Sequence, residues 1–127
     1  QELKGFRSEE SIYNLAYNAS TPEIEAWLSG KVKAYRTGGE GLNPLPHEGQ
    51  VRLTTTSYGP GNCEHHLEAA IERLLARPEG WLIYNTHGLD DEGWGPISSR
   101  YLDELLKGLT RIDSVYIMPV FRALTKF

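Results

Sequence analysis

The spacing of apolar and polar residues changes several times along the chain, and these changes predict strands that alternate with helices. Short apolar or β-branched runs are typical of strands, whereas apolar residues three and four apart are typical of helices. The sequence predicts strands at 12–17, 31–36, 50–56, 81–85 and 115–118. It predicts helices at 22–29, 63–76, about 99–109 and 120–125.

Residues at the predicted helix ends support these assignments. Thr21 is a suitable N-cap and Pro22 suits the first helical position, while Asn62 and either Ser98 or Ser99 are suitable caps for the next two helices. The helical spacing predicts three apolar faces, of which the third is expected to be buried: Ile24, Trp27 and Leu28; Leu67, Ile71, Leu74 and Leu75; and Leu102, Leu105, Leu106 and Leu109.

Strand–helix alternation predicts an α/β fold with a mainly parallel sheet in a single domain over residues 1–127. Ligands bind at the carboxyl ends of parallel strands, so we expect the strand ends at Asn18, Arg36, Asn85 and Met118 to lie on one side. The glycines of 38–41 precede a proline-rich stretch instead of a helix. They therefore predict a loop at the rim of the sheet and not a phosphate-binding loop.

His87 is the leading candidate for chemistry, because it follows the predicted strand 81–85 and imidazole exchanges protons near neutral pH. The acidic residues of 90–92 come directly after it and could orient the ring or raise its pKa. Trp94, in the same loop, offers a flat apolar surface of the kind that sugar rings stack on. The alternative is that His87 only makes hydrogen bonds within its loop.

Composition narrows the classes of function. The 127 residues carry a net charge of −4 without a Lys/Arg cluster, which argues against nucleic-acid binding. The sequence has no apolar run of about 18 residues, so no membrane span is expected. His65 and His66 are adjacent in a predicted helix and point about 100° apart, so they are poor joint metal ligands. The single cysteine, Cys63, has no partner for an internal disulfide.

Several short stretches resemble the C-terminal half of polysaccharide deacetylases, the carbohydrate esterases with a NodB-homology domain. The main one is Gly80-Trp-Leu-Ile-Tyr-Asn-Thr-His-Gly88, followed by Trp94, Pro96-Ile97, Tyr101-Leu-Asp-Glu-Leu-Leu106 and Val115-Tyr-Ile-Met118. Upstream, Leu15-Ala-Tyr-Asn18 and Ala34-Tyr-Arg36 resemble the middle section of the family. The resemblance covers the chain from about Ile12 onward.

The resemblance implies part of a distorted (β/α) barrel that hydrolyses N- or O-acetyl groups of a glycan. It places the family's general acid on His87. It places substrate-binding or supporting roles on Asn85, Trp94, Tyr17, Asn18 and Arg36. It also slightly favours an extracytoplasmic or secreted location.

The resemblance further implies a divalent metal, usually zinc, held by one Asp and two His. The family's Asp-Asp and His-x-x-x-His motifs lie before its middle section, and nothing at that place in this chain matches either motif. We therefore expect the isolated chain to bind no catalytic metal, and we expect self-association or a missing N-terminal half. The alternative is a non-catalytic carbohydrate-binding or structural remnant of the fold. An Asp-Asp and His-x-x-x-His segment in the parent reading frame would favour the enzyme.

Overall fold

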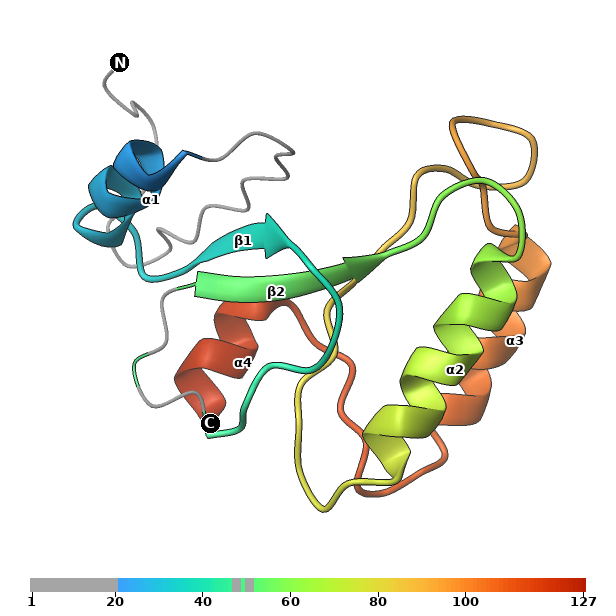
Figure 1. Cartoon of the computed structure of the whole chain (residues 1–127). Helices are drawn as coiled ribbons and strands as arrows, with labels where there is room; N and C mark the ends of the chain where they lie inside the picture. Colours follow the sequence, from blue (N-terminus) through green and yellow to red (C-terminus); the bar gives the residue numbers. More distant parts are fainter. Residues whose placement is uncertain (1–20, 47–48, 50–51) are drawn as a thin grey trace.

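The computed structural model describes residues 21–46, 49 and 52–127, and it has a mixed α/β architecture (Figure 1). The predicted strand 12–17, and Tyr17 and Asn18 with it, lie outside these residues. The described elements are α1 (Pro22–Ser29), β1 (Tyr35–Gly38), β2 (Arg52–Ser57), α2 (Cys63–Leu75), β3 (Tyr84–Asn85), α3 (Ser99–Leu109) and α4 (Val120–Lys126). Within the described residues, no helix has the length and apolar character needed to cross a lipid bilayer.

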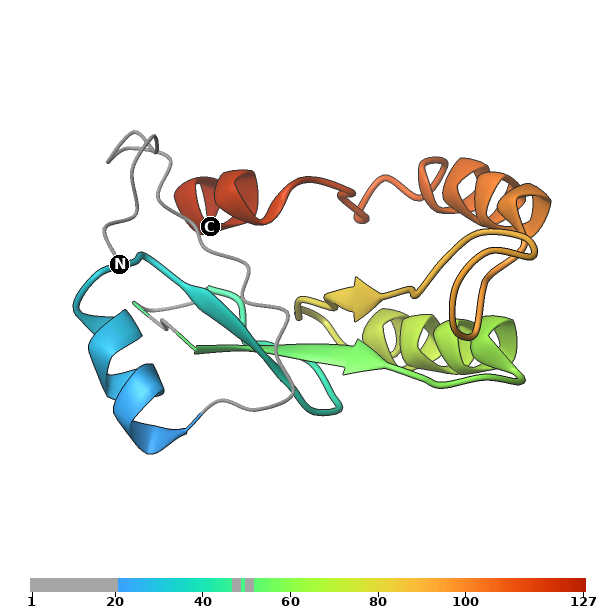
Figure 2. The ribbon, with the colours of Figure 1, turned by 90° about the horizontal axis from the view of Figure 1, so that it is seen from above.

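The strands form one small sheet in the order β1-β2-β3, and both pairings are parallel. This confirms the predicted α/β class and the parallel sheet. The three described strands form an open sheet and do not close a barrel. Figure 2 shows α1 and α4 on opposite sides of β1 and β2, so this chain itself contributes helices to both sides of the sheet.

The strand predicted at 115–118 is wrong. Residues 115–119 are irregular and lead directly into α4. Tyr116 and Ile117 are 58% and 52% exposed, so the apolar run is not buried in a sheet. The apolar pattern is therefore insufficient here, because a strand also needs a neighbour to pair with.

The strand predicted at 81–85 is shortened to β3 by the buried side chain of Asn43. Asn43 Nδ2 donates to the carbonyl of Thr54, and Asn43 Oδ1 accepts from the backbone N–H of Thr54, both at 2.8 Å. On its other side the Asn43 backbone exchanges two hydrogen bonds with Trp81. Asn43 therefore occupies the space between β2 and Trp81, and direct pairing of β2 with β3 begins only at Tyr84. Asn43 thus forms an isolated bridge to Trp81, and the 38–44 segment does more than shape the rim of the sheet.

The packed residues form two groups. Leu28, Val32 and Tyr35 join α1 to β1. Leu67, Ile71 and Ile97 join α2 to the segment before α3, with the partly buried Leu102, Leu105 and Leu109 packed against them. The predicted burial of Leu106 is wrong, because its side chain is exposed. Ile24, Trp27 and Leu75, on the other two predicted apolar faces, are exposed as well. Only one edge of each of these helices faces the core, so its predicted apolar face is wider than the buried strip.

Strand register assigns the side chains to two faces, because paired residues on neighbouring strands point the same way. Arg36 pairs with Leu53, and Asn85 pairs with Ser57. Leu53 and Ser57 are four positions apart in β2, so Arg36 and Asn85 share one face. The opposite face carries Tyr35, which packs on α1, and Tyr84, whose hydroxyl donates to the Cys63 carbonyl of α2. Helices α1 and α2 therefore cover the face opposite to Arg36 and Asn85.

Two adjacent threonines in β2 are expected to respond oppositely to valine. The Thr55 hydroxyl is buried and makes no hydrogen bond among the described residues. The Thr56 hydroxyl accepts from the Gly41 N–H at 3.1 Å and donates to the Gly41 carbonyl at 3.2 Å. Thr55→Val should raise the free energy of unfolding by about 1 kcal/mol, since it removes an unpaired buried polar group. Thr56→Val should lower it by about 1–3 kcal/mol. Denaturant melts of both variants test the pair, and equal effects would contradict the assignment.

Candidate functional site at the carboxyl edge

The carboxyl edge of the sheet brings together two of the predicted site residues. Arg36 Nη1 donates to Asn85 Oδ1 at 3.4 Å, although the two residues belong to strands on either side of β2. The Arg36 side chain is partly buried, and desolvation lowers the pKa of its guanidinium from the ordinary value. The group stays charged at neutral pH. The predicted placement of Arg36 and Asn85 on one side is confirmed.

His87 lies two residues beyond the end of β3, and its side chain is exposed to solvent. Its ring meets the indole of Trp94 edge-on, with centroids 5.2 Å apart and an interplanar angle of 69°. Trp94 is 62% exposed, so one indole surface stays open. The indole lies over Gly59 in the turn after β2, where an added Cβ would be 2.6 Å from Trp94 Cη2. The turn after β2 and the loop after β3 thus hold His87 and Trp94 together.

The loop after β3 closes on itself and so fixes His87 at its start. The Ile97 N–H donates to the Gly88 carbonyl at 3.1 Å, and the Asp90 N–H donates to the Ile97 carbonyl at 2.9 Å. Gly93 has φ +82°, and a Cβ there would be 2.2 Å from the His87 carbonyl oxygen. Only glycine fits that conformation and spacing. The backbone of His87 is therefore held by a loop that turns back to touch it.

Asp90 does not orient His87. Its Oδ1 accepts from both the backbone N–H and the hydroxyl of Ser99, each at 2.9 Å. These hydrogen bonds hold the pKa of Asp90 below its ordinary value. Among the described residues, Asp91 and Glu92 make no side-chain hydrogen bond or ion pair with His87. The predicted acidic partner of the imidazole is therefore wrong for Asp90, which instead anchors the start of α3.

The hydrogen bonds between Asp90 and Ser99 should make the free energy of unfolding depend on pH in the acidic range. A folded-state pKa below the ordinary 3.8 stabilises the fold above that pH, and this contribution disappears as pH falls through the folded value. Asp90→Ala should therefore be less stable than wild type at neutral pH, and the difference should shrink below pH 3.8. Asp91→Ala is the matched control. Unfolding measured at a series of pH values would contradict this role if the Asp90→Ala deficit did not change.

The three-residue zinc site implied by the resemblance is not assembled in the part of the chain that the structure describes. There, no three His, Cys, Asp or Glu side chains are clustered closely enough to hold a metal ion. His66 stacks on Tyr58, with centroids 3.3 Å apart and an interplanar angle of 15°, whereas His65 is exposed. The Cys63 thiol is buried and donates to the Gly59 carbonyl at 2.9 Å. The described residues therefore do not fit the one-Asp, two-His set implied by the resemblance.

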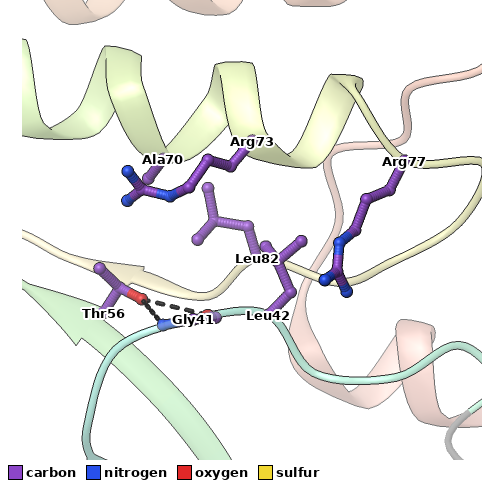
Figure 3. A pocket seen from close by; sticks show the side chains of 7 residues that line it. All are labelled: Gly41, Leu42, Thr56, Ala70, Arg73, Arg77 and Leu82. Atoms are coloured by element: carbon purple, nitrogen blue, oxygen red, sulfur yellow. Dashed lines mark hydrogen bonds between the residues drawn. The ribbon is translucent and has the colours of Figure 1, made fainter.

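The sequence did not predict two hollows that the structure contains. One, of about 500 Å³, lies where α2 and α3 begin, and its lining includes Glu64, Glu68 and Tyr101. Burial and then the nearby Glu68 raise the pKa of Tyr101 from its ordinary value, and its hydroxyl donates to the Glu64 carbonyl at 3.2 Å. The other, of about 240 Å³, is bordered by Arg73 and Arg77 (Figure 3). Arg73 lies in the last turn of α2 and Arg77 lies beyond its end, so helical spacing gave no signal for this hollow.

In comparisons with known proteins, no protein-family model, curated protein or solved structure matches the chain.

Proposed function

We propose that this chain forms part of a polysaccharide deacetylase-like carbohydrate esterase that removes N- or O-acetyl groups from a glycan. The observation that carries the proposal is the convergence at one sheet edge: Arg36 and Asn85 are hydrogen-bonded, and His87 with Trp94 follows the same strand as Asn85. The resemblance of Gly80–Gly88 supports the assignment. Arg36 comes from β1, whereas Asn85, His87 and Trp94 come from β3 and the loop after it, so the fold brings two separate stretches of the chain together.

The proposed role of His87 is that of general acid. Hydrolysis of an acetamide adds water to the carbonyl carbon, and collapse of the tetrahedral intermediate breaks the C–N bond. The departing nitrogen needs a proton to leave as an amine, and the products are acetate and the free amino sugar. A protonated imidazole can supply that proton near neutral pH. The exposed position of His87 leaves its ring accessible to a bound glycan.

Trp94 is proposed to bind the sugar ring, because its exposed indole surface lies beside the acid. The indole meets the His87 ring with centroids 5.2 Å apart and an interplanar angle of 69°, which sets the distance between the stacking surface and the proton donor. Arg36 and Asn85 are proposed to contact polar groups of the glycan or to support those that do. Tyr17 and Asn18 keep this supporting role as part of the proposal.

A catalytic zinc, as implied by the resemblance, would need ligands from outside the described residues. The proposal places them in an N-terminal half carried elsewhere in the complete polypeptide or by a partner. That half would also supply further strands, since the described sheet is open. Three parallel strands with α1 and α2 on one face are consistent with a segment of a (β/α) barrel. An extracytoplasmic location remains part of the same proposal.

The second candidate is a non-catalytic carbohydrate-binding module, favoured by the exposure of Trp94 and by the open sheet. Both candidates predict glycan binding, and only the first predicts hydrolysis.

The test is acetate release from an acetylated chitooligosaccharide by the complete polypeptide supplied with zinc. Release of acetate together with free amino groups supports the esterase. Saturable binding without acetate release supports the binding module. Neither binding nor acetate release would overturn both candidates.

A further inference from the structure

The Arg36 side chain reaches across the sheet on the face opposite to α1 and α2. Arg36 of β1 is paired with Leu53 of β2. Asn85 of β3 is paired with Ser57, further along β2. The hydrogen bond from Arg36 Nη1 to Asn85 Oδ1 therefore requires the arginine side chain to pass over β2. Thr55 lies midway between Leu53 and Ser57 on this face, so the side chain crosses β2 near Thr55.

The strand beneath this crossing is buried. Leu53 and Thr55 are both buried, and the Thr55 hydroxyl has no hydrogen-bond partner among the described residues. Burial alone lowers the pKa of the Arg36 guanidinium. A cation partly removed from water costs free energy unless a negative charge compensates it. The face also has open space, because a Cβ added to Gly38, the partner of Thr55, would meet no atom within 4 Å.

The unpaired nitrogen atoms on this face are hydrogen-bond donors. Within the described part of the chain, the guanidinium of Arg36 makes one side-chain hydrogen bond and no ion pair. Because Asn85 Oδ1 accepts that bond, the amide nitrogen Nδ2 is the atom left to donate. Asp90, in the loop after β3, is held by Ser99. A ligand that fits these groups must supply acceptors and negative charge.

An internal role for Arg36, which ties β1 to β3, explains part of this arrangement. The tie is long at 3.4 Å, since N–H···O bonds are typically about 2.9–3.0 Å. Its acceptor is a neutral amide, which compensates a desolvated cation less than a carboxylate does. The tie therefore leaves most of the positive charge of Arg36 uncompensated.

We propose that Arg36 and Asn85 bind a carboxylate of the ligand, and that the glycan handled at this edge contains acidic sugars of the uronate type. An ionised carboxylate only accepts hydrogen bonds, and its oxygens match the planar fork of a guanidinium. His87 and Trp94 follow Asn85 along the chain, so an acidic sugar and the sugar stacked on the indole would be neighbours. The inference rests on the proposed glycan function and names the class of glycan.

The test compares two ligands that differ only in the carboxylate. One is a tetrasaccharide in which N-acetylglucosamine alternates with glucuronic acid, and the other is its carboxyl-reduced form. Calorimetric titration of the full chain at constant ionic strength should show about tenfold or more tighter binding of the acidic form, the effect of a hydrogen bond to a charged group. The net charge of −4 disfavours anions in general, so this preference requires a local site.

Two variants test the residues. Arg36→Gln should remove the preference for the acidic form. Asn85→Asp should remove it as well, because the new carboxylate would pair with Arg36, and this variant should melt at or above the wild-type temperature. Arg100→Gln, which removes an exposed arginine from α3, should keep the preference. A preference that survives Asn85→Asp, or Arg36→Gln in folded protein, would overturn the site.

Acetate, the product of the proposed reaction, is the third ligand. Acetate binding as tight as that of the acidic tetrasaccharide would assign the site to the product and overturn the acidic glycan. Equal saturable binding of both tetrasaccharides would overturn the carboxylate site and leave a glycan site. Acetate binding that depends on Arg36, without binding of either tetrasaccharide, would overturn the glycan function and keep the carboxylate site. No binding of any of these ligands would overturn both.

Discussion

Under the proposed esterase function, replacing His87 by alanine should lower deacetylation about 10²–10⁴-fold, the usual contribution of a general acid. The variant lacks the group proposed to protonate the departing amine, whereas the acetyl group and the sugar can still bind. Folding should change little, because the side chain is exposed and its ring contact is with Trp94, which is itself mostly exposed. The measurement is turnover on an acetylated chitooligosaccharide together with the melting transition.

His65→Ala is the matched control, since it removes an exposed histidine on α2 that belongs to no proposed site. Its turnover and melting transition should equal those of wild type. If His87 only stabilises its loop, the variant should instead melt earlier and keep its rate per folded molecule. Near-wild-type turnover in well-folded His87→Ala would remove this residue from the mechanism.

The second large effect is expected for Gly93→Ala, which should lower the free energy of unfolding by about 2–6 kcal/mol. A left-handed backbone costs a non-glycine residue about 1–3 kcal/mol, and forcing an atom into a filled space costs about 1–3 kcal/mol more. Both apply here, because φ is +82° and the new Cβ would be 2.2 Å from the His87 carbonyl oxygen. Denaturant unfolding measures the loss. The backbone signals of His87 should also shift, since relief of the clash must move it.

Gly108→Ala provides the contrast. Gly108 lies within α3, and an added Cβ meets no atom within 4 Å. Alanine is favoured over glycine inside a helix by about 1 kcal/mol, so this variant should gain stability. Equal effects of the two substitutions would show that the 88–97 loop does not hold His87 in the described conformation.

Local signals predicted the helices well. Thr21 and Ser98 accept hydrogen bonds from the N–H groups of Ile24 and Tyr101, as expected for N-caps. Asn62 is the exception: its backbone is left-handed at φ 58° and its side chain makes no cap bond. Capping by a neighbouring side chain depends on a few adjacent residues, so sequence can indicate it.

The features that were not predicted depend on contacts between residues far apart in the sequence. Asn43 was assigned to an irregular loop, yet its side chain replaces strand pairing beside Thr54. Arg36 and Asn85 could be placed together because parallel strands align their carboxyl ends. The hydrogen-bond partner of Asp90 could not be predicted, because both Ser99 and His87 are close to it in the sequence. Only the closure of the loop through Ile97 decides between them.

The most direct test of the carboxyl-edge site is an NMR titration of this chain with an N-acetylated chitooligosaccharide. Saturable shifts are predicted for Asn85, His87 and the indole N–H of Trp94, with smaller changes at Arg36. Trp94→Ala should abolish them, whereas Trp27→Ala, which removes an exposed indole on α1, should leave them intact. Shifts confined to other surfaces, or no saturable shift at any glycan concentration, would contradict a glycan site at this edge.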